Sequence, residues 1–309
     1  MGRGLTAYVV RRLGWALVTL LGISVINFIL IFAVPVDPAR MIVGIHAPES
    51  TVIAVRHALG LDRPVWIQYV LFLWRLLHFN LGYSYLMNRP VTGLIAQAFG
   101  NTARLAVAAF AAEILIGGTL GYVAAFQRGR FADRALSLVG LVGMSIPNYW
   151  LGAMFLFLFA FAIPIFPLYG QGNVNLVLPA LTIGLTGAAY YMRVLRTSLI
   201  EIIQSDHVRT ARAKGLGPWS LSVRHVVRNA LIPVVTLAGM DIAGMLSGIV
   251  IIESVFGWPG IGLLSYQAIQ NLDIPVVMGT VLYTTTVIVL LNLAVDVAYA
   301  FLDPRVRYG

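Results

Sequence analysis

Six long apolar stretches divide this chain, and each is long enough to cross a membrane. A helix needs about 20 mostly apolar residues to span a hydrocarbon core of about 30 Å. The first stretch, Leu13–Val34, has no ionisable side chain. The other expected spans are Leu105–Phe126, Ala135–Ile163, Val177–Leu199, Ala230–Ile252 and Ile274–Phe301. The pattern predicts an all-α integral membrane protein with six transmembrane helices.

The third and fourth spans are cut from one uncharged run, Ala135–Met192. Pro164, Pro167 and the segment Gly170–Asn173 interrupt it with residues typical of turns. Irregular backbone is not tolerated where it faces lipid. We therefore expect the run to leave the membrane there and return.

Composition supports the membrane assignment. The 309 residues are 59% hydrophobic and 11% charged, which is far too apolar for a soluble domain. No cysteine is present, which excludes disulfides, iron–sulfur ligation and thiol chemistry.

The basic residues predict the orientation of the chain. An even number of spans places both termini on one side, and segments rich in Lys and Arg stay in the cytoplasm. The side expected to be cytoplasmic carries Arg3, Arg11, Arg12, Arg128, Arg130, Arg134, Arg193, Arg196, Arg209, Arg212, Lys214, Arg224, Arg228, Arg305 and Arg307. The opposite side carries Arg40, Arg56, Arg63, Arg75, Arg89 and Arg104, in or beside one long loop. The net charge of +9 thus indicates topology and contact with lipid headgroups, not nucleic-acid binding.

The hydropathy pattern also suggests three parts. Residues 1–34 form an N-terminal tail and the first helix, 35–100 form a small extracytoplasmic cap, and 101–309 form a five-helix core that contains the loop 200–229. Within the cap, Pro64–Phe79 is apolar and aromatic-rich, as in a helix that lies at the headgroups or packs on the spans. Direct contact of this helix with substrate is the alternative.

Three acidic residues fall inside expected spans. Glu113 and Asp241 lie near mid-span, and Asp296 lies near the end of the last span. Ionisable groups in a bilayer are costly and tend to face protein or water, so each is a functional candidate. Hydrogen bonding between helices and lining of a pathway both remain open for Glu113 and Asp241. Asn148 and Tyr190 are further candidates for the pathway.

The loop between the fourth and fifth spans predicts two short helices. Ser205 or Asp206 can cap a helix over 207–214, and Asp206 at its start suits the helix dipole. Turn-forming residues at 215–218 end that helix. A second helix over 219–229 then leads back to the membrane.

The surface of the first loop helix could bind a partner. Ala211 and Ala213 make it slim enough to enter a groove, while Arg209, Arg212 and Lys214 could pair with acidic groups there. A basic helix that rests on lipid headgroups is the alternative.

Two motifs in this loop carry a resemblance. RTARAKG at Arg209–Gly215 and RNALIPVVT at Arg228–Thr236 resemble the EAA loop of bacterial ABC importer permeases, in the form found in the B-type subunits of the dipeptide/oligopeptide (peptide/nickel) permeases. The loop begins Arg209, Thr210, Ala211, where the general pattern has Glu-Ala-Ala, and the peptide branch shares this departure. Other similar segments are VPVDPAR at Val34–Arg40, LGLDRPVWIQY at Leu59–Tyr69, IIESVFGWPGIG at Ile251–Gly262 and LDPRVRYG at Leu302–Gly309.

The resemblance implies a subunit of the bacterial inner membrane that forms half of a translocation pathway, with peptides as the first substrate expectation and nickel, glutathione or sugars left open. Its implied partners are a second, homologous permease, two ABC ATPases that bind ATP and Mg²⁺, an extracytoplasmic binding protein and membrane lipid. The chain itself would bind no cofactor or metal and catalyse no reaction. The loop around 206–218 would dock on an ATPase through Asp206, Arg209, Thr210, Ala211, Arg212, Ala213, Lys214, Gly215 and Leu216.

Two other functions are alternatives to this one. A proton-coupled carrier would use Glu113 and Asp241 as proton sites. An intramembrane aspartyl protease would use Asp241 and Asp296, but the Gly-x-Gly-Asp signature is missing because 238–240 reads Ala-Gly-Met. A P-loop is excluded, since the only lysine, Lys214, lies between alanine and glycine.

Overall fold

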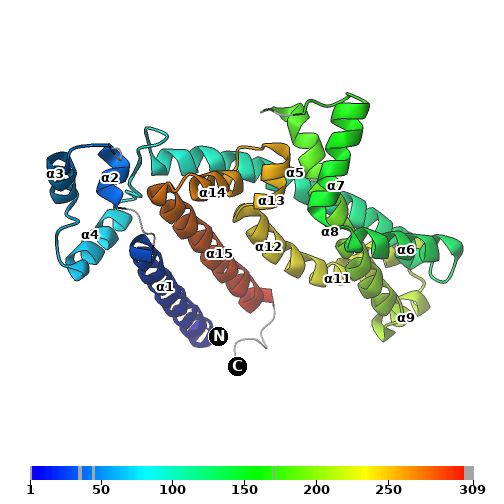
Figure 1. The fold of residues 1–309 in the computed structure, drawn as a ribbon. Helices are drawn as coiled ribbons and strands as arrows, with labels where there is room; N and C mark the ends of the chain where they lie inside the picture. The colour runs from blue at the N-terminus through cyan, green and yellow to red at the C-terminus, as the bar shows by residue number, and fades with distance from the viewer. Residues whose placement is uncertain (1, 34–36, 44–45, 169, 171, 303–309) are drawn as a thin grey trace. The chain divides into compact units, whose positions relative to one another are not determined.

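The computed structural model describes residues 2–33, 37–43, 46–168, 170 and 172–302, and the chain is almost entirely helical (Figure 1). The described residues group into two compact units. The first comprises 1–101, 246–250 and 260–309, and the second comprises 102–245 and 251–259.

The first unit contains the N-terminal helices, a two-stranded hairpin, the start of a long fifth helix and the last two helices of the chain. Its elements are α1 (Gly2–Ala33), α2 (Pro38–Val43), α3 (Glu49–Leu59), α4 (Val65–Leu77), β1 (Tyr83–Ser84), β2 (Arg89–Pro90), the first residues of α5 (Val91–Phe126), α14 (Ile261–Gln270) and α15 (Ile274–Leu302).

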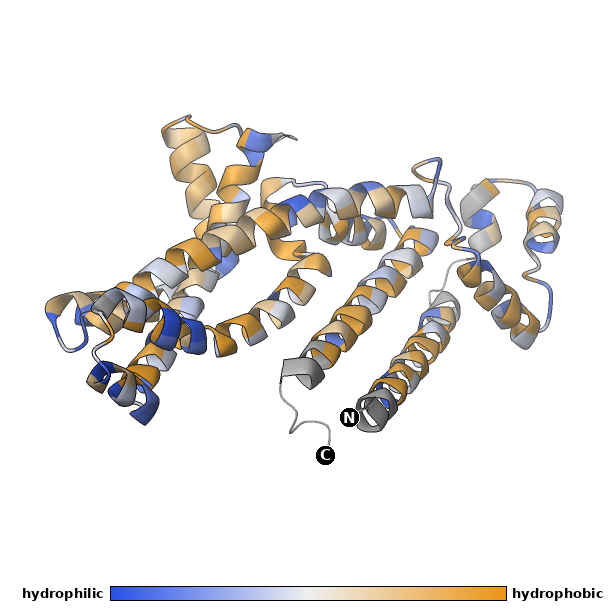
Figure 2. Ribbon diagram, turned by 180° about the vertical axis from the view of Figure 1, so that it is seen from behind, coloured by the Kyte–Doolittle hydropathy of each residue, from blue (hydrophilic) through white to orange (hydrophobic). Residues whose placement is uncertain are grey.

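Within the first unit, α1 packs along α15, and both helices are dominated by apolar residues (Figure 2). Asn27 Nδ2 donates a hydrogen bond to the Met278 carbonyl at 3.0 Å. The antiparallel hairpin is tied to the α14–α15 turn, where Ser84 Oγ donates to Asp273. The core of the first unit is formed by Val91, Leu94, Ile95, Ala98, Ile261, Leu264, Ala268 and Val276.

The second unit is organised around α8 (Asn173–Ile203), on which α6 (Phe131–Ser145) and α7 (Asn148–Leu156) pack. Its other elements are the rest of α5, the π-helix η1 (Phe157–Ala162), α9 (Asp206–Ala213), α10 (Pro218–Ser220), the π-helix η2 (Leu221–Val227), α11 (Arg228–Ala230), α12 (Ile232–Leu246) and α13 (Val250–Phe256), the last two extending by one residue into the first unit.

Helix α5 approaches α8 closely through glycines. A Cβ at Gly117 would lie 2.6 Å from the Ala188 carbonyl oxygen, and one at Gly121 would lie 2.8 Å from that of Met192. Only glycine lets the backbones come so near, as small residues do at many membrane helix interfaces.

The six expected spans all occur as helices, of which four are unbroken and two are bent. The third bends by 95° between α6 and α7. Pro147 cannot continue the preceding helix, and Ile146 before it is extended, with ψ at 123°. The expected continuous helix over 135–163 was therefore wrong in its middle.

The fifth span also departs from expectation. It bends by 43° between α11 and α12, and α12 ends at Leu246 instead of running to Ile252. Gly248 has φ at +110°, a conformation in which a helix cannot continue. The expected turn between the third and fourth spans is confirmed, because no helix covers the described residues between Ala162 and Asn173.

The linear division into 1–34, 35–100 and 101–309 stays a prediction; α5 begins at Val91, inside the expected cap. Residues 303–309, which hold most of the LDPRVRYG motif, lie outside the described residues. So does the side chain of Asp296.

Candidate functional site

The predicted helical loop is present and is held by the chain's own core. Helix α8 ends at Ile203, and α9 starts at Asp206. Val208 and Ala211 turn inward and are buried with Leu199 and Val226 in one apolar cluster. The loop is therefore anchored to an apolar cluster that includes the end of α8.

A sharp turn follows α9, as the sequence predicted. Lys214 is its C-terminal cap residue, and Gly215 adopts φ at +80°. The Leu216 N–H then donates to the Ala211 carbonyl, which closes the turn. A Cβ at Gly215 would meet no described atom within 4 Å, so glycine is required here by the backbone conformation and not by crowding.

The N-terminal cap differs from expectation. Ser205 occupies the cap position, but its hydroxyl makes no capping bond and instead donates to the Ile202 carbonyl at 2.6 Å. Asp206 lies in the first turn, where its charge suits the helix dipole.

Helix α9 is largely hydrophilic (Figure 2). Arg209, Thr210 and Ala213 are exposed, as is Lys214 beyond them. Arg209 lies 3.6 Å from Asp206, but the two side chains are 77% and 97% exposed, so this ion pair contributes little to stability. The guanidinium of Arg209 is accessible to a partner.

An apolar recess of about 510 Å³ adjoins α9. Phe126 from the end of α5, Ile203 from α8 and Val208 from α9 line it, together with Arg212 and Leu216. The predicted docking residues thus differ in their surroundings. Ala211 is buried beside Val208, which was not among them; Arg212 and Leu216 line the recess, and Arg209, Thr210 and Ala213 are exposed.

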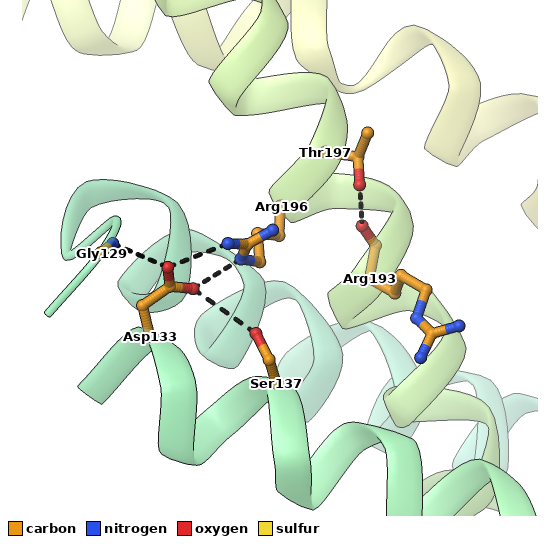
Figure 3. Close-up of polar contacts among 6 residues, drawn as sticks. All are labelled: Gly129, Asp133, Ser137, Arg193, Arg196 and Thr197. Atoms are coloured by element: carbon orange, nitrogen blue, oxygen red, sulfur yellow. Dashed lines mark hydrogen bonds and ion pairs between the residues drawn. The ribbon is translucent and has the colours of Figure 1, made fainter. Parts of the chain in front are cut away.

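A partly buried ion pair joins α8 to α6 about three turns before α9 begins (Figure 3). Arg196 Nε lies 2.6 Å from Asp133 Oδ1, and Arg196 Nη2 lies 2.9 Å from Asp133 Oδ2. The Gly129 N–H and the Ser137 hydroxyl donate to the same carboxylate. Sequence reasoning missed this pair, because 63 residues separate its members.

The acidic residues of two spans come together. The Glu113 side chain is 2% exposed, and its Oε2 has no hydrogen-bond partner among the described residues. It packs against Gly187 of α8, which has no side chain to displace it. Its carboxyl interacts with that of Asp241, which accepts a hydrogen bond from the Tyr191 hydroxyl at 3.0 Å.

The other two pathway candidates are more exposed. Tyr190 is 44% exposed, and its ring centroid lies 6.5 Å from that of Tyr191, which bonds Asp241. Asn148 is exposed at the start of α7. Their role in a pathway stays a prediction.

Sequence reasoning also overlooked Glu253, inside the IIESVFGWPGIG segment. This side chain is fully buried, and its Oε1 accepts a hydrogen bond from Thr102 Oγ1 at 2.8 Å. The Trp258 N–H donates to the backbone carbonyl of Glu253 at the C-terminal end of α13. The sequence feature that could have identified Glu253 is the presence of an acidic residue within an apolar run.

Known proteins resemble the chain over its whole length. Residues 117–308 match the family model for the binding-protein-dependent transport system inner membrane component, and 5–106 match the model for the N-terminal part of such membrane components. A Brucella abortus protein described as a peptide transport system permease is 37% identical over 98% of this chain and 100% of its own. The dipeptide transport system permease DppB of Alkalihalophilus pseudofirmus is 32% identical, and the glutathione transport system permease GsiC of Salmonella choleraesuis is 35% identical, covering 98% and 97% of this chain and 99% of each relative.

Two solved structures share the fold. The MetNI methionine ABC transporter in inward-facing form superposes with a TM-score of 0.55 at 20% identity, over 68% of this chain and 96% of that one. An amino acid ABC transporter superposes with a TM-score of 0.50 at 14% identity, over 66% and 92%.

Proposed function

The chain belongs to the family of inner membrane components of binding-protein-dependent transport systems, and we propose that it is the permease subunit of an ATP-driven peptide importer, coupled to an ATPase through α9. The outward, cationic face of α9 carries this proposal. It presents Arg209 and Lys214 to solvent while Val208 and Ala211 anchor the helix to α8.

Peptides are the proposed substrate. The most similar relatives include proteins described as peptide and dipeptide transport system permeases, and their lengths match this chain almost completely. We assign di- and oligopeptides as the class, and the extracytoplasmic binding protein as the component that selects among them.

The proposed assembly has four other subunits. A second, homologous permease completes the pathway, two ATPases bind ATP and Mg²⁺, and a binding protein delivers the substrate. ATP hydrolysis is assigned to the ATPases because the sequence has no P-loop. The distribution of Arg and Lys supports cytoplasmic termini and a cytoplasmic α9.

Coupling would be mechanical. Binding of α9 by an ATPase brings Arg209 and Lys214 opposite acidic groups, and an apolar side chain of the ATPase fits the recess beside α9. When the ATPases close, α9 moves with them, and the buried base of the loop passes this motion to α8. The Asp133–Arg196 pair carries it to α6.

The test is a charge reversal on the outward face of α9. Arg209→Glu should abolish co-purification of the ATPase and peptide-stimulated ATP hydrolysis in proteoliposomes, because like charges would then meet. Arg134→Glu is the matched control, since Arg134 is exposed on α6 outside the loop. If Arg209→Glu keeps both ATPase binding and peptide-dependent uptake at the level of the control, α9 is not the coupling element.

A further inference from the structure

Helix α4 has one side that packs on the first span. The Tyr69 ring lies 5.3 Å from that of Phe28, and the Phe72 ring lies 5.6 Å from it. The Tyr69 and Ser24 hydroxyls are 2.9 Å apart and share a hydrogen bond. Ser24 and Phe28 lie near the end of Val9–Ile29, the membrane-spanning part of α1. These contacts fix α4 beside one end of that span.

A second side of α4 is apolar and has no cover in the described part of the chain. Trp66, Val70, Trp74 and Leu77 are 70%, 58%, 61% and 75% exposed. At 3.6 residues per turn these four side chains fall within an arc of about 80°. They therefore form one continuous apolar face, which we call the tryptophan face.

The polar side chains of α4 lie on the opposite side. Gln68 and Arg75 point about 140–160° away from the middle of the tryptophan face. Gln68 Nε2 donates to the carbonyls of Leu61 and Arg63, which turns it toward the preceding loop. Arg75 is exposed. The helix thus has an apolar side that does not contact α1 and a polar side opposite to it.

We infer that the tryptophan face lies in the headgroup–acyl boundary of the membrane and anchors the segment around α4 to the lipid surface. Tryptophan is enriched at this depth because its ring is apolar while its N–H can reach water. Along α1, Ile26 and Ile29 lie at the level of the residues that contact α4, and both are exposed, so lipid must cover α1 at this height. Arg75 on the far side would face headgroups and water.

Site-directed spin labelling tests this inference, since the chain has no cysteine to remove. Single substitutions Val70→Cys and Leu77→Cys place a nitroxide on the tryptophan face. Gln68→Cys and Arg75→Cys are the matched controls on the polar side. Each labelled chain is assembled with its partner subunits in lipid nanodiscs, and collision with oxygen, which concentrates in lipid, is compared with collision with a water-soluble nickel chelate.

The labels at 70 and 77 should favour oxygen over the nickel chelate at least tenfold more than the labels at 68 and 75. Equal ratios at all four positions would place the tryptophan face in water and overturn the inference. Protection of 70 and 77 from both reagents would also overturn it, because a protein partner would then cover the face. The outcome is separate from coupling at α9, since the measurement needs no ATP hydrolysis.

Discussion

Removing the charge of Arg196 should destabilise the protein strongly, because this guanidinium compensates a buried carboxylate. Asp133 is 6% exposed at its side chain and accepts both bonds of a bidentate pair, at 2.6 and 2.9 Å. Breaking such a pair from one side costs about 3–5 kcal/mol. The Gly129 N–H and the Ser137 hydroxyl remain for Asp133, so Arg196→Met should lower the free energy of unfolding by about 3 kcal/mol, at the lower end of that range.

Replacing the acidic partner of the pair should cost less stability than replacing Arg196. Asp133→Asn leaves the positive charge on Arg196, whose side chain is 27% exposed and can reach water, so about 1.5 kcal/mol is expected. In the double variant no charge is left unpaired, and its cost should fall below the sum of the single changes by about 2 kcal/mol. The two single substitutions are expected to differ in cost because Asp133 is more deeply buried than Arg196.

The measurement is unfolding of the purified chain in mixed micelles, followed by tryptophan fluorescence. Arg193→Met is the matched control, because Arg193 lies one turn earlier on α8 and its guanidinium points away from Asp133 (Figure 3). If Arg196→Met costs no more than Arg193→Met, or if the two single changes are additive, the pair does not hold α6 to α8 in the way described.

Two further predictions test other parts of the molecule. Asp37 is bound by Arg56, and although burial acts to raise its pKa, the bonds from Arg56 and the Ala39 N–H lower it overall. A lowered pKa adds stability that is complete above the unfolded value near 3.8 and is lost as the pH falls through the folded value. The protection of backbone amides in α2 and α3 from exchange, relative to their intrinsic rates, should therefore fall below about pH 4. Asp37→Asn should remove this pH dependence. In the membrane, Glu113→Gln should leave the thermal midpoint within a few degrees, because a neutral amide fits beside Asp241. Glu113→Ala leaves a cavity and should lower the midpoint further. Equal midpoints for the two variants would show that the volume of the side chain does not decide stability at this site.

The sequence predicted the membrane architecture well, and the reason is physical. Every backbone group inside a bilayer must be hydrogen-bonded within the chain, so an apolar run of sufficient length becomes a helix whatever its neighbours are. The turn at 215–218 was equally predictable, because Gly215 permits the positive φ of the turn and Pro218 fixes its own φ.

The limits of local reasoning appear at helix breaks. Pro147 was visible in the sequence, but a proline within an apolar run is compatible with a kink or with a sharp bend. In the folded chain α7 packs against α8, and the angle between α6 and the α7 segment is 95°. Packing also decided which glycines bring helices close, since Gly117 meets α8 while a Cβ at Gly118 would meet no described atom within 4 Å.

The sequence by itself determined that this is a multi-span membrane protein of the permease family with a basic helical loop, because hydropathy, turn residues and contiguous motifs are all local properties. Only the tertiary structure decided which side of α9 is available. Ala211, expected on a docking surface, is buried, whereas Arg209 is exposed. It also brought Asp133 to Arg196 and Tyr191 to Asp241. Such pairs depend on how distant helices pack, and the spacing of residues along one chain does not encode that packing in a form that local rules can read.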